Sequence, residues 1–352
     1  MRVFAPLILT GSTRAIAEGV AGAGAKKTGP GAGPPGEGGT TSDDKGSATS
    51  DNVTHNASPP QAASTPECVW PLGAQLGEGP YWSAAEEAVW FVDIKGKFIH
   101  RFHEPTGKTQ SFPAPSEPGF IAPAKDGGIL AGLKTGLHRF NPKTGEFEPF
   151  HKVEPNARNN RLNDGYVDGA GYLWFGSMDD DEKDPTGALY QLTESGIEQR
   201  DQDYVITNGP TASPDNRTLY HTDTLKKLIY AFDRARDGTL SNRRVFTRIG
   251  EGDGHPDGPI TDSEGNIWSG LYGGWGVNRY APDGRKVSKL AMPVANVTKA
   301  AFGGKDLRTL YITTAWKGLS DKERKEQPNA GGLFRVRVDA TGLPQGIIAH
   351  GL

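Results

Sequence analysis

The chain has 352 residues, more than a typical single domain, although all-β folds often reach that length in one domain. Its 48 glycines and 26 prolines favour many short strands joined by turns over a helical fold. A net charge of -3, with scattered basic residues, excludes the charge pattern of a protein that binds nucleic acid or an anionic membrane. The single cysteine, Cys68, excludes an intrachain disulfide and a cysteine-based zinc cluster.

Residues 1–66 are expected to form a disordered, low-complexity N-terminal extension. From about residue 19 this segment is rich in Gly, Ala, Pro, Ser, Thr and Asp, and it has too little apolar surface to offset the entropy lost on ordering. The apolar run before it is interrupted by Pro6 and ends at Leu9, so the sequence does not indicate export and we expect a cytoplasmic protein. No run is long and apolar enough to span a bilayer.

Residues 67–352 repeat one pattern, in which a turn rich in Gly, Pro, Asn or Asp precedes a short apolar strand. The strands centre on Trp90, Leu130, Trp174, Tyr220, Trp268 and Tyr311. Their period of about 40–50 residues, with further strands in each unit, is typical of propeller blades. The six repeats therefore predict an all-β, six-bladed β-propeller closed by strands from both ends. A β-sandwich can also space its strands regularly, but it would not repeat the same turn and strand six times.

In a propeller, loops around the innermost strands meet at the central channel, so polar residues from distant repeats can form one site. Glu78, Asn208 and Asp257 each lie in a loop flanked by Gly or Pro, in different repeats. Two carboxylates and an amide oxygen would make a hard oxygen shell for Ca²⁺, Mg²⁺ or Mn²⁺. Because Asn, Asp and Gly are also common turn residues, the spacing alone slightly favours ordinary turns over a metal site.

Seven motifs occur in one collinear order from about Trp70 to the C-terminus. They are Leu76-Gly-Glu-Gly-Pro-Tyr-Trp82, Phe91-Val-Asp-Ile94 with Ile99-His-Arg101, Arg161-Leu-Asn-Asp-Gly165, Gly176-Ser-Met-Asp179, Asn208-Gly-Pro with Ser213-Pro-Asp, Pro256-Asp-Gly258, and Phe302-Gly-Gly-Lys-Asp306 before Leu310-Tyr-Ile-Thr-Thr314. In these motifs the chain resembles the SMP-30/gluconolactonase/regucalcin family of sugar lactonases. The sequence departs from that family in Gly-Pro-Thr-Ala after Asn208 and in its N-terminal extension.

The resemblance implies a six-bladed propeller with one divalent ion in the central channel. The metal ligands of the family fall on Glu78, Asn208 and Asp257, and the ion could be Ca, Zn, Mg, Mn or Fe. The ion would polarise the lactone carbonyl, and Asp257 would also act as the catalytic base. The alternative is a hydroxide generated at the metal, with Asp257 purely a ligand.

Substrate contacts of the family fall on Arg161 and Asn163, and an acidic contact falls near Asp181, in a run of three aspartates. Arg161 could otherwise form a surface or inter-blade ion pair. Together these residues imply an enzyme that opens a small-molecule sugar lactone to its acid, as a monomer or weak homodimer. The alternatives are a non-enzymatic calcium-binding regulatory propeller, or a hydrolase of other small lactones or organophosphate esters. The complete axial polar set favours the enzyme.

Overall fold

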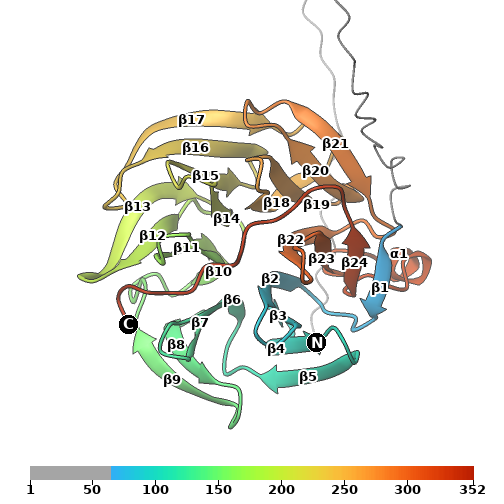
Figure 1. The fold of residues 1–352 in the computed structure, drawn as a ribbon, viewed down its shortest axis with the longest axis horizontal. Coiled ribbons are helices and arrows are strands. Elements are labelled where there is room, and N and C mark those ends of the chain that lie inside the picture. The colour runs from blue at the N-terminus through green and yellow to red at the C-terminus, as the bar shows by residue number, and fades with distance from the viewer. Residues whose placement is uncertain (1–64) are drawn as a thin grey trace, which may run out of the picture. The chain divides into compact units, whose positions relative to one another are not determined.

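The computed structural model describes residues 65–352, which form six four-stranded antiparallel sheets arranged as blades around a central channel (Figure 1). The prediction of an all-β, six-bladed β-propeller is confirmed. Residues 1–64 lie outside the described residues, and so does nearly all of the extension predicted over residues 1–66. Within residues 65–352, no helix has the length and apolar character needed to cross a membrane.

Blades 1 to 5 each take their strands in chain order from the channel outward. Blades 1 to 3 contain β2 (Gly77–Ser83), β3 (Ala88–Asp93), β4 (Phe98–His103), β5 (Lys108–Pro113), β6 (Pro118–Pro123), β7 (Ile129–Leu133), β8 (Gly136–Asn141), β9 (Glu146–His151), β10 (Asn160–Val167), β11 (Leu173–Asp179), β12 (Gly187–Thr193) and β13 (Gly196–Tyr204). Blades 4 and 5 contain β14 (Thr207–Ala212), β15 (Thr218–Asp223), β16 (Leu228–Arg234), β17 (Leu240–Arg248), β18 (His255–Thr261), β19 (Ile267–Tyr272), β20 (Gly276–Tyr280) and β21 (Lys286–Ala291).

Blade 6 is completed by both ends of the described chain. It contains β22 (Val297–Gly303), β23 (Thr309–Thr314) and β24 (Leu333–Arg337), with helix α1 (Asp321–Glu326) in the connection before β24. The outermost strand is β1 (Glu67–Trp70), which pairs antiparallel with β24. This pairing closes the ring, because it joins the first strand to the last blade as the sequence predicted.

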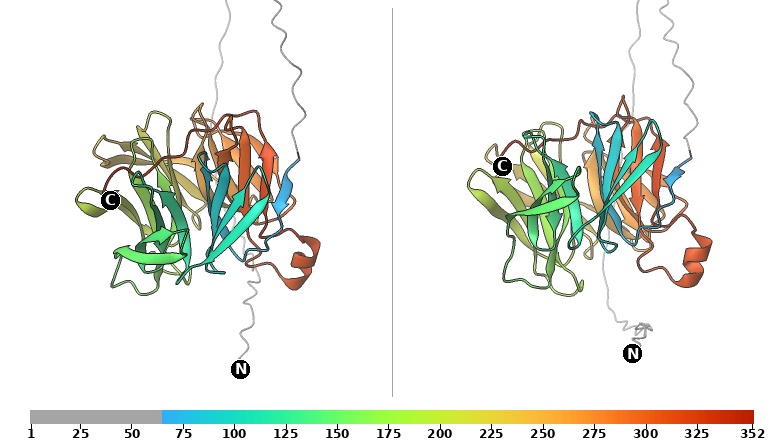
Figure 2. Two further views of the ribbon diagram at one scale, coloured as in Figure 1. Left: turned by 60° about the horizontal axis from the view of Figure 1, so that its bottom comes forward. Right: turned by 90° about the horizontal axis from the view of Figure 1, so that it is seen from below.

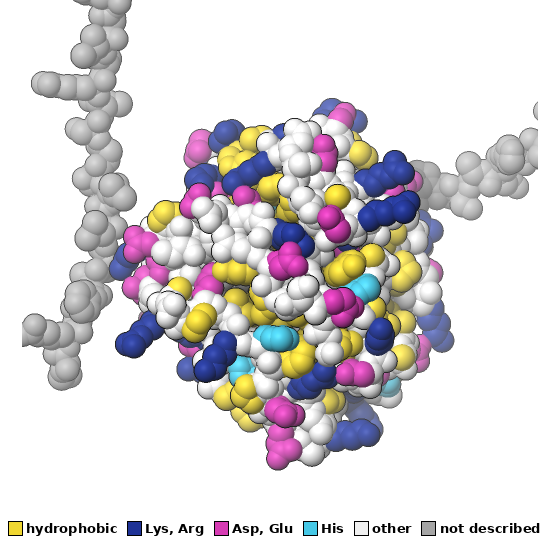
Figure 3. Space-filling view, turned by 90° about the vertical axis from the view of Figure 1, so that its left-hand side faces the viewer, with side chains coloured by type: hydrophobic (Ala, Val, Ile, Leu, Met, Phe, Trp, Pro, Cys, Tyr) yellow, Lys and Arg dark blue, Asp and Glu magenta, His cyan; other side chains and the backbone are white. Residues whose placement is uncertain are grey.

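Burial follows the position of a strand within its blade. Every residue of β3, β11 and β23 is buried, because these strands are covered on both faces by neighbouring blades. The repeating aromatic residues Trp90, Trp174 and Tyr311 lie on them and pack in the core. Outer strands such as β5 and β17 are largely exposed. The side of the molecule that carries β13 and β17 accordingly shows Lys and Arg mixed with Asp and Glu (Figure 3).

The residues after β24 form an extended C-terminal segment that crosses the face opposite α1 (Figures 1 and 2). It makes isolated bridges to two blades, through Gly342 with Asp262 and through Ile348 with Ala124. Ile348 is fully buried. Residues 343–346 of this segment line a small cavity at that end of the channel. The segment therefore covers one end of the channel and leaves the opposite end for a site.

A buried ion pair joins blades 3 and 4. Asp168, in the turn between β10 and β11, accepts hydrogen bonds from Trp174 Nε1 at 2.9 Å and from Arg234 Nη2 at 2.6 Å. The Asp168 side chain is fully buried and that of Arg234 is nearly so. Asp262 repeats the arrangement in blade 5 with a tryptophan and an arginine of its own.

Asp168→Ala is expected to lower the free energy of unfolding by about 3–5 kcal/mol, because it leaves the Arg234 guanidinium buried without its counter-charge. Urea unfolding followed by tryptophan fluorescence measures the loss. Asp283→Ala removes an exposed carboxylate that lies 3.9 Å from Arg285, and it should change stability by less than about 0.5 kcal/mol. Equal losses in the two variants would contradict the assignment of a structural role to this buried pair.

Candidate active site

The innermost strand of every blade changes register partway along its pairing with the second strand. The shifts lie between Glu78 and Tyr81, Pro118 and Phe120, Leu162 and Gly165, Asn208 and Thr211, Pro256 and Pro259, and Val297 and Ala300. Residues at such irregularities leave the regular ladder, and the strand bends there, which re-aims side chains. Four predicted site residues lie in or beside these stretches, namely Glu78, Asn163, Asn208 and Asp257.

A pocket of about 230 Å³ lies at the end of the channel opposite the C-terminal segment. Five of the six residues predicted for the site line it: Glu78, Arg161, Asn163, Asn208 and Asp257. They come from the innermost strands of blades 1, 3, 4 and 5. Other lining residues that the sequence analysis did not assign include Met178, Glu182, Tyr272 and Lys317. The structure therefore brings together predicted site residues that are up to 179 positions apart in the chain, from Glu78 to Asp257.

Glu78 and Asp257 are two buried carboxyl groups in direct contact. Burial, and next the negative charge of Asp164, raise the pKa of Glu78 to about 7, against the opposing charge of Lys299. Burial, and next the charge of Glu78, raise the pKa of Asp257 well above its ordinary value. Two adjacent buried carboxylates repel each other, so a bound cation would stabilise the pair as two anions.

The Asn208 amide is held in one orientation by Thr224. Thr224 Oγ1 donates its single proton to the Pro256 carbonyl at 3.0 Å, so it must accept the hydrogen bond from Asn208 Nδ2, at 2.9 Å. Asn208 Oδ1 therefore points the other way, where it accepts a hydrogen bond from Asn163 Nδ2 at 2.9 Å. A carbonyl oxygen has two lone pairs, so Oδ1 can accept a further contact.

These three side chains fit a divalent cation. Glu78 and Asp257 supply two carboxyl groups whose pKa values are raised by burial and by neighbouring negative charge, and Asn208 supplies an oriented amide oxygen. Hard oxygen donors are suited to Ca²⁺, Mg²⁺ or Mn²⁺. The described residues contain no group of three or more His, Cys, Asp or Glu side chains suited to a metal ion. The candidate site therefore depends on the amide.

Arg161 and Asn163 form one wall of the pocket and hold each other in place. Arg161 Nη1 donates to Asn163 Oδ1 at 2.5 Å, and Asn163 Nδ2 also donates to the Thr207 carbonyl at 2.6 Å. Arg161 Nε donates to Asp180 Oδ1 at 2.8 Å. Among residues 65–352, no partner is recorded for Arg161 Nη2, so this group is available to a ligand.

A buried ion pair lies beside the two carboxyl groups, and the sequence analysis missed it. Lys299 Nζ is 2.6 Å from Asp164 Oδ1, and Asp164 Oδ2 accepts a hydrogen bond from the Gly209 amide at 2.8 Å. A Cβ atom on Gly258 would lie 2.6 Å from Lys299 Cδ, so the lysine side chain needs a glycine at this position. The sequence did offer a signal for this pair, because Lys299 is the single charged residue in the otherwise apolar and polar, buried strand β22.

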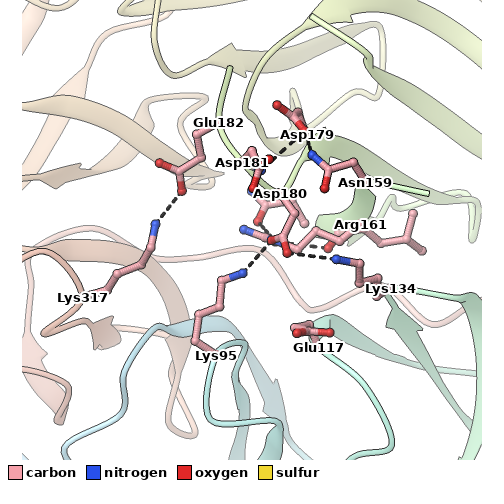
Figure 4. A network of polar contacts seen from close by, with 12 residues as sticks. Lys95, Glu117, Lys134, Asn159, Arg161, Asp179, Asp180, Asp181, Glu182 and Lys317 are labelled. Carbon is pink, nitrogen blue, oxygen red and sulfur yellow. Dashed lines mark hydrogen bonds and ion pairs between the residues drawn. The ribbon is translucent and has the colours of Figure 1, made fainter. Parts of the chain in front are cut away.

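The sixth predicted residue, Asp181, lies outside the pocket lining. Its side chain is 63% exposed, and its ion-pair partner is Lys183, at 3.9 Å. The neighbouring acidic residues lie inward instead: Asp180 binds Arg161, and Glu182 lines the pocket (Figure 4). Consecutive carboxylates cannot be told apart in the sequence because the β11–β12 loop sets their directions, with Glu182 at a φ of 59°.

The family model for the SMP-30/gluconolactonase/LRE-like region matches residues 76–316. The chain belongs to this family. The match covers most of the propeller and every pocket residue named above except Lys317, so the family predicted from the sequence motifs is confirmed.

Members of the SMP-30/gluconolactonase/LRE-like family that resemble this chain carry several names. A 6-deoxy-6-sulfogluconolactonase of Pseudomonas putida is 32% identical, over 81% of this chain and 99% of that protein. An L-arabinolactonase of Azospirillum brasilense is 34% identical, over 76% of this chain and 90% of that protein. The crystal structure of a calcium-binding protein, regucalcin, from Agrobacterium tumefaciens superposes with a TM-score of 0.78 at 26% identity, covering 82% of this chain and 97% of that one.

Proposed function

We propose that this protein hydrolyses a sugar-acid lactone to its open-chain acid, with a divalent ion in the central channel. The observation that carries the proposal is the meeting of Glu78, Asp257 and the oriented oxygen of Asn208 at one pocket, with Arg161 and Asn163 on its wall. Related proteins named for lactonase activity, at 32% and 34% identity, favour the same reaction class.

Glu78, Asn208 and Asp257 would hold the ion, which when bound supplies Lewis acidity toward the lactone carbonyl oxygen. Asp257 accepts a proton from the water whose oxygen attacks the carbonyl carbon. The bond between that carbon and the ring oxygen then breaks, and the ring oxygen leaves as a hydroxyl group after taking the proton.

Arg161 and Asn163 orient the sugar rather than react with it. Arg161 has Nη2 available for a substrate hydroxyl, while its other nitrogens are fixed by Asn163, the Leu162 carbonyl and Asp180. A guanidinium held at three points loses little conformational freedom when it binds substrate. We therefore assign substrate positioning to Arg161 and Asn163, and we assign no substrate contact to the exposed Asp181.

Acid release from a panel of aldonolactones tests the proposal. The purified full chain is assayed after treatment with EDTA, and then with Ca²⁺, Mg²⁺, Mn²⁺, Zn²⁺ or Fe²⁺ restored. Turnover that is lost on chelation and regained with one ion would support a metal-dependent lactonase. Metal binding measured by calorimetry, without turnover of any lactone, would instead favour a calcium-binding regulatory protein, the second function that relatives named regucalcin suggest.

Removing divalent ions is expected to make stability fall as the pH rises from about 4.5 to about 7. Glu78 has an ordinary pKa of 4.5 and a pKa of about 7 in the folded chain without metal. In this range the unfolded chain has already released a proton that the folded chain still holds, so rising pH favours unfolding. A bound cation replaces that proton and removes the effect.

Thermal unfolding in EDTA and in excess Ca²⁺, at intervals between pH 4.5 and 7.5, measures this difference. The gap between the two melting temperatures should widen with pH, and Glu78→Gln should reduce the widening, since its amide does not titrate. Two parallel curves would contradict a cation site at Glu78.

A further inference from the structure

The rim of the pocket carries an ion cluster that joins three blades. Lys95 Nζ lies 2.6 Å from Asp180 Oδ1, Lys134 Nζ lies 3.0 Å from Asp180 Oδ2, and Arg161 Nε lies 2.8 Å from Asp180 Oδ1 (Figure 4). Lys95 is in the β3–β4 turn of blade 1, and Lys134 is in the β7–β8 turn of blade 2. Three cationic side chains therefore share one carboxylate.

The pocket lining adds a fourth cation. Lys317 Nζ lies 2.5 Å from Glu182 Oε1, and the Lys317 backbone carbonyl accepts a hydrogen bond from the Tyr272 hydroxyl, which fixes this loop. Four cationic side chains thus face two carboxylates. The nearby pair Lys97–Glu117 adds one positive and one negative charge, so it does not change the difference between cations and carboxylates.

Two further carboxylates lie close to the cluster. Asp93, two residues before Lys95, accepts hydrogen bonds from the backbone amides of Gln75, Leu76 and Gly96. Asp179 accepts hydrogen bonds from the backbone amides of Lys183 and Asp184 in its own loop, and from the Asn159 side chain. Asp93 and Asp179 are both engaged by backbone amides, so among residues 65–352 the four cations have only Asp180 and Glu182 as ion-pair partners.

These cations are partly removed from water. The side chains of Lys95 and Lys134 are 20% and 28% exposed, and that of Arg161 is 2% exposed. Partial burial alone would raise the pKa of Asp180, but the hydrogen bonds from Lys95 and Lys134 hold that pKa far below its ordinary value. Each ammonium has three N–H donors and gives one to Asp180, so donors remain for a bound anion. Positive charge that is partly buried costs free energy unless a bound anion neutralises it.

We propose that this rim binds an anionic group of the substrate, a carboxylate, sulfonate or phosphate at the end of the sugar remote from the lactone carbonyl. The proposal rests on the lactone hydrolysis proposed above and adds the substrate class. Arg161 connects the proposed metal site to the rim. Its Nη1 contacts Asn163, which lies beside the proposed metal-binding oxygen of Asn208, and its Nε contacts Asp180 at the rim. The proposal places the lactone carbonyl at Glu78 and Asp257 and the far end of the sugar beside Arg161 and Lys317, which line the pocket and adjoin Lys95 and Lys134 through Asp180 and the β11–β12 loop.

Three lactones that differ only at carbon 6 test this proposal: glucono-1,5-lactone, its 6-phosphate and its 6-deoxy-6-sulfonate. The kcat/KM of the full chain is measured for each, with the active metal present and at two salt concentrations. We expect kcat/KM to be at least about tenfold higher for an anionic lactone than for the neutral one, and this preference should shrink as salt screens the rim. The phosphate and sulfonate arms identify which anion the rim prefers.

Lys95→Met and Lys134→Met are each expected to lower the ratio of anionic to neutral kcat/KM by about tenfold. Lys97→Met is the matched control, since Lys97 is two positions from Lys95, is 49% exposed and pairs with Glu117 instead. It should preserve the ratio. Calorimetric binding of the product acids, gluconate and 6-phosphogluconate, gives a second readout that needs no turnover.

The outcomes separate this proposal from the lactonase proposal. If neutral and anionic lactones are hydrolysed equally well, and Lys95→Met leaves the ratio unchanged, the anion site is refuted while lactone hydrolysis stands. If no lactone is hydrolysed but 6-phosphogluconate binds more tightly than gluconate in a manner that depends on Lys95, lactone hydrolysis is refuted and the anion site stands.

Discussion

Asp257→Asn is expected to lower kcat/KM for lactone hydrolysis by about a thousandfold, which is within the usual contribution of a general base. The change removes the proton acceptor and one of the two carboxylates proposed to hold the metal, while it keeps the volume of the side chain. Stopped assays of acid release with metal in excess measure the loss. Metal content, measured on the same sample, separates lost ligation from lost proton transfer.

Asp181→Asn is the matched control for Asp257→Asn. It makes the same chemical change in a carboxylate that is 63% exposed and outside the pocket lining. We expect its kcat/KM to stay within about twofold of the unmodified protein, because surface substitutions away from a site usually have small effects. Comparable losses in the two variants would show that the acidic contact predicted from the family does act through Asp181.

Lys299→Met is expected to lower the free energy of unfolding by about 3–5 kcal/mol. Lys299 is 2.6 Å from Asp164, and both side chains are buried, so the variant leaves Asp164 charged and without its partner. Urea unfolding with divalent ion present measures the loss. Lys305→Met, at a lysine that is 90% exposed and 3.5 Å from Glu87, should change stability by less than about 1 kcal/mol.

A double-mutant cycle identifies the cause of that loss. If the cost comes from an uncompensated charge, Asp164→Asn combined with Lys299→Met should be much more stable than the sum of the two single losses predicts. Additive losses would show that Lys299 acts through the packing of its carbon chain against Gly258 rather than through its charge.

The architecture of residues 67–352 and five residues of the pocket lining could be predicted from the sequence. Buried aromatic residues such as Trp90 and Trp174 recur at blade spacing because each blade needs the same apolar strand between its neighbours. Glu78, Asn208 and Asp257 stand in Gly- or Pro-flanked motifs, which accompany the register shifts of the innermost strands. Their assignment as metal ligands, and that of Asn163 as a substrate contact, came from the resemblance to the family.

Which charged groups meet could not be predicted from the sequence and is seen only in the folded chain. Lys299 and Asp164 are 135 residues apart, and Lys95 lies 85 residues before Asp180, so no local pattern joins them. The choice between Asp180 and Asp181 also depended on the conformation of one loop. The two side chains are chemically identical, and the loop backbone places one toward Arg161 and leaves the other exposed. Ring closure sets these contacts, because a propeller brings the same end of every innermost strand to a single axis whatever the separation along the chain.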